Sequence, residues 1–122
     1  MLSAHTVTFS QNEATTRATI EALTRTFFTL TECTFEENTS DDSSSVIYAV
    51  GVEPRSGVSS SITGGAFRRN RSKAGGNAFT LIFCSIEVTS VTFDGNMAAK
   101  QSANIYAIYS TMKFSASNFL NS

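Results

Sequence analysis

The chain has 122 residues, of which 41% are hydrophobic, and this is enough for one compact unit and too little for two. Its net charge is −1 and its pI is about 5.7, which gives no electrostatic basis for binding nucleic acid or an anionic membrane. No apolar run approaches the roughly 20 residues that a membrane span needs, and residues 1–11 lack the basic and apolar regions of a secretory signal. We therefore expect no nucleic-acid partner and no membrane insertion.

The first predicted element contains Phe9, which opens the tetrapeptide FSQN, and the same Phe-x-x-Asn pattern returns along the chain. It stands at Phe35, Phe67 and Phe93 as FEEN, FRRN and FDGN. The successive Phe residues are 26, 32 and 26 residues apart, and another 26 residues reach Phe119. Recurrence at a nearly fixed period is typical of a repeat architecture, so we expect four to five coils of roughly 26 residues.

Residues 12–25, which read NEATTRATIEALTR, are the only window with a helix-like pattern. Their threonine content and their place inside the repeat argue against a helix. Elsewhere apolar and polar residues alternate, as in TFFTLTECTF (residues 26–35) and CSIEVTSVTF (residues 84–93). Alternation of this kind, with many β-branched side chains, predicts β-strands.

Alignment of the coils on the repeat Phe places apolar residues in shared columns. Seven residues before it the column is Leu2, Phe28, Ser60, Ile86 and Met112, and five residues before it the column is Ala4, Leu30, Ile62, Val88 and Phe114. Twelve residues after it the column is Ile47, Phe79 and Ile105, and fourteen residues after it the column is Leu23, Ala49, Leu81 and Ala107. We expect three short strands per coil, each turning alternate side chains inward, so that the stacked coils share one core.

The recurring Asn occupies the same turn of every coil, where its amide can bond to the Asn of the next coil and satisfy turn backbone groups. We therefore predict a structural ladder of Asn12, Asn38, Asn70 and Asn96, beside a stacked core column of Phe9, Phe35, Phe67, Phe93 and Phe119. The tripeptides NTS and NRS at Asn38 and Asn70 also read as acceptors for N-glycosylation. We favour the ladder, because an amide turned inward cannot carry a glycan.

The second coil is six residues longer than its neighbours, and GVEPRSG at residues 51–57 supplies the extra length. We expect this segment to protrude as a loop from a single solenoid segment, residues 1–122, which belongs to a longer repeat array.

Charges alternate in the outward position after the repeat Phe, where Glu36, Arg68 and Asp94 follow one another, and Arg69 falls beside Glu37 in the same way. The alternation favours one coil register, because a slipped coil would bring like charges together. The alternative is a basic patch for a polyanion, which the acidic coils on either side make weaker.

Residues suited to catalysis or metal binding are sparse. His5 is the only histidine, and the sequence shows no supporting group that would complete a Ser-His-Asp or Cys-His arrangement with it. Cys33 and Cys84 fall in different columns two coils apart, which favours buried free thiols over a disulfide or a metal pair. We expect no catalytic residue, no metal and no cofactor in this segment.

Four aromatic residues could bind a ligand or make a lateral contact. Tyr48 and Tyr106 share one outward column, and Phe83 and Tyr109 share another. Exposed rings on a flat strand face can pack on sugars or on a neighbouring solenoid. Ordinary half-buried rings are the alternative, and the sequence leaves both open.

The Phe-x-x-Asn element, with AGGNAF at residues 74–79, resembles the right-handed parallel β-helix repeats of the pectin-lyase-like superfamily and of bacterial polymorphic outer membrane proteins. The resemblance covers essentially the whole chain and implies an all-β, right-handed parallel β-helix. Polysaccharide lyases with this fold use clustered outward carboxylates with calcium, a pattern that the acidic residues here do not match. Those residues are Glu36, Glu37, Asp41, Asp42 and Asp94.

The resemblance also implies an extracellular or cell-surface location. We expect a structural module of a fibre, adhesin or coat protein, not an enzyme, which self-associates or stacks on coils of a related chain. Uncapped coil ends favour this association. The alternative is a carbohydrate-binding or polysaccharide-cleaving β-helix whose site lies on the outer aromatic face or outside this segment.

Overall fold

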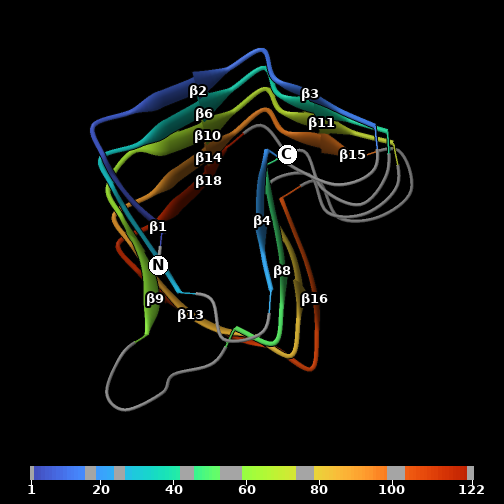
Figure 1. The fold of residues 1–122 in the computed structure, drawn as a ribbon. Helices are drawn as coiled ribbons and strands as arrows, with labels where there is room; N and C mark the ends of the chain where they lie inside the picture. Colours follow the sequence, from blue (N-terminus) through green and yellow to red (C-terminus); the bar gives the residue numbers. More distant parts are fainter. Residues whose placement is uncertain are drawn as a thin grey trace.

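A computed structural model describes residues 2–15, 19–23, 27–41, 46–52, 59–73, 79–98 and 104–120. Within these ranges the chain forms β-strands and no helix, and it winds into a parallel β-solenoid of about four turns (Figure 1). The predicted all-β solenoid is thus confirmed. Each complete coil has four strands where the sequence predicted three, because the chain bends once more just before each ladder Asn and forms a two-residue strand after it.

Each complete coil contributes one strand to each of four parallel sheets, named here A to D in chain order, and a last partial coil adds one strand to A and one to B. Sheet A contains β1 (Leu2–His5), β5 (Phe28–Thr31), β9 (Ser60–Thr63), β13 (Ser85–Thr89) and β17 (Thr111–Ser115). Sheet B contains β2 (Thr8–Ser10), β6 (Thr34–Glu36), β10 (Ala66–Arg68), β14 (Thr92–Asp94) and β18 (Asn118–Leu120). Sheet C contains β3 (Glu13–Ala14), β7 (Thr39–Ser40), β11 (Arg71–Ser72) and β15 (Met97–Ala98). Sheet D contains β4 (Ile20–Ala22), β8 (Ile47–Val50), β12 (Phe79–Ile82) and β16 (Ile105–Ile108).

The strand register reproduces nearly all of the predicted columns. In sheet A, Leu2 pairs with Phe28 and Val88 pairs with Ile62, and in sheet B Phe67 lies between Phe35 and Phe93. The inward residues of the middle coils form one apolar cluster in which most side chains are fully buried. The core therefore runs along the solenoid axis, enclosed by the sheets.

One position of the predicted columns is wrong. Ala22, not Leu23, pairs with Ala49 and is buried, while Leu23 is 48% exposed. The first coil has one residue fewer between its ladder Asn and sheet D than the second coil has, so counting from the Phe misplaces it by one. The described parts of residues 12–25 form β3 and β4, as the argument against a helix predicted.

Single residues in the left-handed backbone conformation turn the chain at three corners of the coil. They are Thr6, Glu32, Gly64, Ser90 and Ala116 between sheets A and B, Gln11, Glu37, Arg69 and Gly95 between B and C, and Gly51, Phe83 and Tyr109 between D and A, with φ from 49° to 69°. In all but the last described coil their N–H groups still donate to the following coil, as from Glu37 to the Arg68 carbonyl (3.0 Å). This hydrogen bonding around the corner offsets a conformational cost of roughly 1–2 kcal/mol per residue.

Gly65 marks the closest approach of two coils. Its φ is +85°, and a Cβ at this position would overlap the carbonyl oxygen of Cys33 in the coil before. Only glycine fits there. Of the predicted loop at residues 51–57, Gly51 and Val52 are described and the rest lies outside the described residues; the extra length falls between β8 and β9.

Candidate functional site

The predicted asparagine ladder is confirmed as a chain of hydrogen-bonded side chains. Asn38 Oδ1 accepts from the backbone N–H (3.1 Å) and from Nδ2 (2.9 Å) of Asn12. Asn38 Nδ2 donates to the Phe9 carbonyl (3.0 Å) and to Asn70 Oδ1 (2.9 Å). Asn70 and Asn96 repeat this pattern, and all three side chains are at most 1% exposed. Each buried amide thereby uses both of its donors and both acceptor sites.

The two ends of the ladder differ from its middle. At the first coil Asn12 is exposed, and within the described residues its Oδ1 accepts no hydrogen bond. At the fourth coil Asn96 Nδ2 donates to Asn104 Oδ1 (2.9 Å), which takes the place of a further ladder Asn. Sequence reasoning missed Asn104, because it lies eight residues after Asn96, where the equivalent position of the second coil is Val46 and not an Asn.

The Phe column beside the ladder is also confirmed. Ring centroids lie 4.7 Å apart from Phe9 to Phe35, 4.8 Å from Phe35 to Phe67, 5.1 Å from Phe67 to Phe93 and 4.7 Å from Phe93 to Phe119. The planes of successive rings are within 10° of parallel. A stack with this repeat follows directly from parallel strands that carry the same residue in register.

The sequons at Asn38 and Asn70 coincide with buried ladder positions. Both side chains are 0% exposed, and their Nδ2 groups donate within the interior. A glycan attached to either amide would have to replace those bonds and leave the solenoid through its wall. The folded chain thus has no room for glycans at these two positions.

The outward charges pair differently from the prediction in one respect. Register places Arg68 between Glu36 and Asp94, as predicted. The ion pair to Glu36 comes instead from Arg69 (3.6 Å), which also lies 3.2 Å from Glu37. Arg69 reaches both carboxylates because it sits at the corner, where its side chain can lean across the neighbouring coil. Such exposed pairs contribute at most about 1 kcal/mol each.

The Glu37 carboxylate gives a testable pH dependence. Hydrogen bonds from Gln11 and Arg69, and the positive charge of Arg69, hold the pKa of Glu37 below its usual value of 4.5. Because the folded pKa is the lower one, the stabilisation is present above the unfolded pKa and is lost as the pH falls through the folded pKa. We expect Glu37→Gln to be slightly less stable than the wild type at pH 7 and the difference to disappear as the pH falls through the folded pKa, as measured by urea unfolding. A constant difference between the two proteins over this pH range would contradict the assignment.

Among the described residues, the side chains that sequence analysis considered for catalysis do not lie together in a catalytic arrangement. His5 is exposed on β1, and Cys33 and Cys84 are buried and free. No group of three or more His, Cys, Asp or Glu side chains that could hold a metal occurs in the described part of the chain. Asp41 is paired with Lys73 (2.7 Å), and Asp42 lies outside the described residues.

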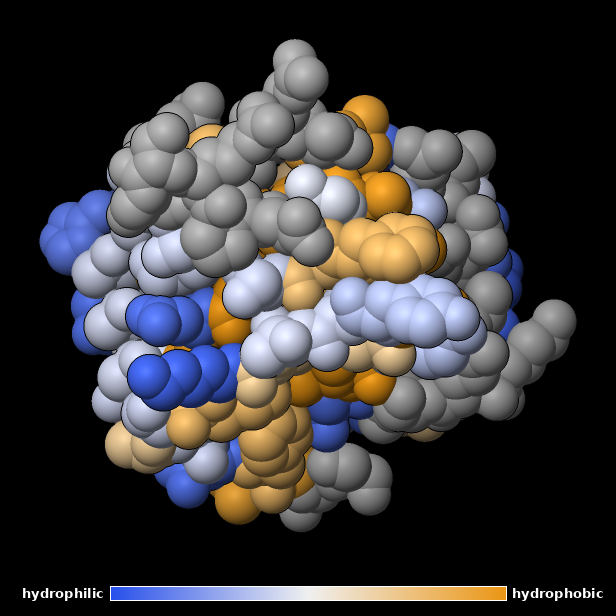
Figure 2. Space-filling model, turned by 90° about the horizontal axis from the view of Figure 1, so that it is seen from below, coloured by the Kyte–Doolittle hydropathy of each residue, from blue (hydrophilic) through white to orange (hydrophobic). Residues whose placement is uncertain are grey.

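The four outward aromatic residues form two separate sets. Phe83 and Tyr109 lie at the corner between sheets D and A, 52% and 81% exposed, with their rings stacked at 5.2 Å. Tyr48 and Tyr106 are half-buried on the outer face of sheet D, with Thr80 between them in register. Figure 2, which views the molecule from below Figure 1, shows exposed hydrophobic side chains beside hydrophilic ones on this side.

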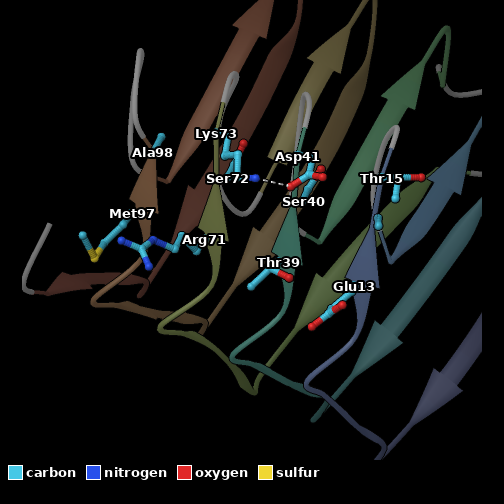
Figure 3. Close-up of a pocket in the computed structure, with 11 residues that line it drawn as sticks. Glu13, Thr15, Thr39, Ser40, Asp41, Arg71, Ser72, Lys73, Met97 and Ala98 are labelled. Carbon is cyan, nitrogen blue, oxygen red and sulfur yellow. Dashed lines mark ion pairs between the residues drawn. The ribbon is translucent and has the colours of Figure 1, made fainter.

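A shallow groove of about 540 Å³ runs across the strands of sheet C, parallel to the solenoid axis (Figure 3). Two outward columns border it and small residues form its floor. The first column is Glu13, Thr39, Arg71 and Met97, the second is Thr15, Asp41 and Lys73, and the floor is Ala14, Ser40, Ser72 and Ala98. Sequence reasoning missed this groove, because two-residue strands of mostly polar residues show no alternation that would mark them.

Comparison of the chain with protein-family models, with curated proteins and with solved structures found no match. The described residues include no helix that is long and apolar enough to cross a membrane. The class that the fold and interior define is a parallel β-solenoid with a buried asparagine ladder.

Proposed function

We propose that this segment is a structural module, one stretch of a β-solenoid in an extracellular or cell-surface fibre, adhesin or coat protein. The observation that carries the proposal is the continuous interior, in which the ladder and the Phe stack pass from coil to coil with every buried ladder amide satisfied. Because each coil contacts only its neighbours, further coils lengthen the solenoid and repeat the same contacts. Length and stiffness then follow from the number of coils.

The exposed coil faces support end-to-end assembly. Phe114 and Phe119 in the last described coil are 38% and 46% exposed, whereas their counterparts Val88 and Phe93 are fully buried. Leu2 in the first coil is likewise exposed. A coil added at either face buries these side chains and pairs the free strand edges. The added coil belongs to the same chain or to a related one.

The location outside the cell rests on the similarity of the Phe-x-x-Asn repeats to those of polymorphic outer membrane proteins and the wider pectin-lyase-like superfamily. The register at the corner between β9 and β10, where Gly64, Gly65 and Ala66 precede Phe67, adds a Gly-Gly-Ala run of the kind that accompanies Phe-x-x-Asn in those repeats.

The proposal predicts that the isolated 122 residues associate at micromolar concentration. We expect sedimentation to show oligomers that grow with concentration, and electron microscopy to show rods of constant width. Phe119→Lys should suppress this growth by placing a charge on the end face, whereas Thr63→Lys, an exposed control on sheet A, should leave it intact. A stable, cooperatively unfolding wild-type monomer at these concentrations would contradict the proposal.

A second candidate, a carbohydrate-binding β-helix, is favoured by the exposed Phe83 and Tyr109 rings alone. Stacked aromatic faces suit the apolar faces of sugar rings. Titration of soluble oligosaccharides, followed by tyrosine fluorescence, separates the two candidates. Saturable binding that Tyr109→Ala abolishes would favour the second.

A further inference from the structure

We propose that the outer face of sheet C is an interface through which two copies of this chain pair about a two-fold axis. The contact supplies the lateral component of the assembly proposed above and rests on it to that extent. Its basis is independent of the end faces, because it depends on two charges that have no partner among the described residues.

Glu13 and Arg71 are the two charges in question. Neither forms an ion pair or a hydrogen bond with another side chain among the described residues. They share a column but are separated by the strand of Thr39, so their backbones are roughly 10 Å apart, twice the usual strand spacing. By contrast Asp41 and Lys73 lie on adjacent coils and pair at 2.7 Å.

The order of this column makes the face complementary to itself. Along the solenoid axis it reads negative, neutral and positive at Glu13, Thr39 and Arg71 (Figure 3). A two-fold axis that lies in the interface and runs parallel to β7 reverses the coil order of the second copy. Glu13 then faces the partner's Arg71, Arg71 faces the partner's Glu13, and the two Thr39 side chains meet at the axis. Two unsatisfied charges per copy become two ion pairs, as in an isologous contact.

The same charges disfavour the other two-fold arrangements. An axis parallel to the solenoid places equal coil levels opposite each other, so that Arg71 meets the partner's Lys73 or Arg71. An axis between β7 and β11 leaves Glu13 opposite the partner's Met97, where a covered carboxylate has no counter-charge. In the favoured arrangement the two Asp41 carboxylates approach the axis, and each is neutralised by its own Lys73.

Other occupants fit the face less well. The groove carries two acidic and two basic side chains, so its net charge is zero and a polyanion gains nothing overall. The strands of sheet C pair on both sides in the middle coils, so an extended peptide cannot add to this face by backbone hydrogen bonds. A small polar ligand is the remaining rival, since the groove has the volume of a ligand site.

Charge reversal and charge exchange test the contact. Sedimentation is measured in the Phe119→Lys background, so that end-to-end growth does not contribute. We expect a dimer that weakens as salt increases, and we expect Glu13→Arg and Arg71→Glu each to raise its dissociation constant at least about tenfold. The double variant Glu13→Arg/Arg71→Glu should recover the dimer, because the exchanged charges again face their opposites.

Arg68→Glu is the matched control, since it makes the same charge change on the outer face of sheet B and should leave the dimer intact. A second readout uses the wild-type end faces: Thr39→Cys should give a disulfide-linked dimer under mild oxidation, and Thr8→Cys on sheet B should not. Unchanged association in the single reversals, failure of the folded double variant to recover, or no cross-link at residue 39 overturns the pairing. A monomer that binds a saccharide in this groove also overturns it. End-to-end growth that persists in such cases leaves the proposed structural role standing.

Discussion

Phe67→Ala is expected to lower the free energy of unfolding by about 3–5 kcal/mol, the range for removing a fully buried aromatic side chain. The Phe67 ring is 0% exposed and stacks on Phe35 and Phe93, and it also contacts Phe79 at a centroid distance of 5.0 Å. Its loss leaves a cavity in the middle coil that adjacent strands cannot close, because their hydrogen bonds fix the distance between coils. Urea unfolding followed by circular dichroism measures the change.

The matched control is Phe119→Ala at the end of the same column. Among the described residues Phe119 stacks on Phe93 alone, meets Phe114 edge-on and is 46% exposed, so its truncation removes less buried apolar area and leaves no enclosed cavity. We expect a loss well under half of that at Phe67. Equal losses at the two positions would mean that Phe67 is not more deeply buried than Phe119, and this would contradict the described Phe column.

Asn70→Ala is expected to cost the protein several kcal/mol, because it orphans groups that are all inside the solenoid. Without the amide, the backbone N–H and Nδ2 of Asn38 lose their shared acceptor, and the Phe35 carbonyl loses its donor. Each buried group left unsatisfied costs roughly 1–3 kcal/mol. The loss is read from the same urea unfolding curves.

Asn12→Ala provides the comparison at the exposed end of the ladder. Asn12 gives one side-chain hydrogen bond to Asn38 and has water at hand to replace it. We expect a change below about 1 kcal/mol. Similar effects of the two substitutions would mean that Asn70 is no more buried than Asn12, which would contradict a ladder that satisfies groups inside the solenoid.

The parts of this structure that could be predicted are those that identical residues mark at a fixed period. Parallel stacking puts equal positions of successive coils side by side, so the Asn and Phe that recur in the sequence had to meet in space. The columns of sheets A, B and D follow for the same reason. Leu23 fails because the coil length varies by one residue within a repeat, and a column count cannot detect an internal shift that is compensated before the next Phe.

The candidate sites could be predicted less well. Asn104 enters the ladder from a column in which the second coil has Val46, and Arg69 reaches Glu36 because of its place at a corner, so neither contact has a periodic signal. The groove on sheet C lies between two short, mostly polar columns that turn outward, with the inward-facing Ser40 and Ser72 between them. These features depend on three-dimensional geometry that spacing along the chain does not encode.

The direction of the ladder bonds has a consequence for how such a body can grow. From Asn12 to Asn70 each side-chain Nδ2 donates to the Asn Oδ1 of the following coil, so these amide dipoles point the same way and reinforce one another along the axis. The ladder is therefore polar: among the described residues Asn12 Oδ1 accepts no hydrogen bond, while Asn96 Nδ2 donates to Asn104 Oδ1. The end-to-end stacking proposed above then has a direction, since an Asn placed before Asn12 would meet an open acceptor and one placed after Asn96 would meet a donor that Asn104 already uses.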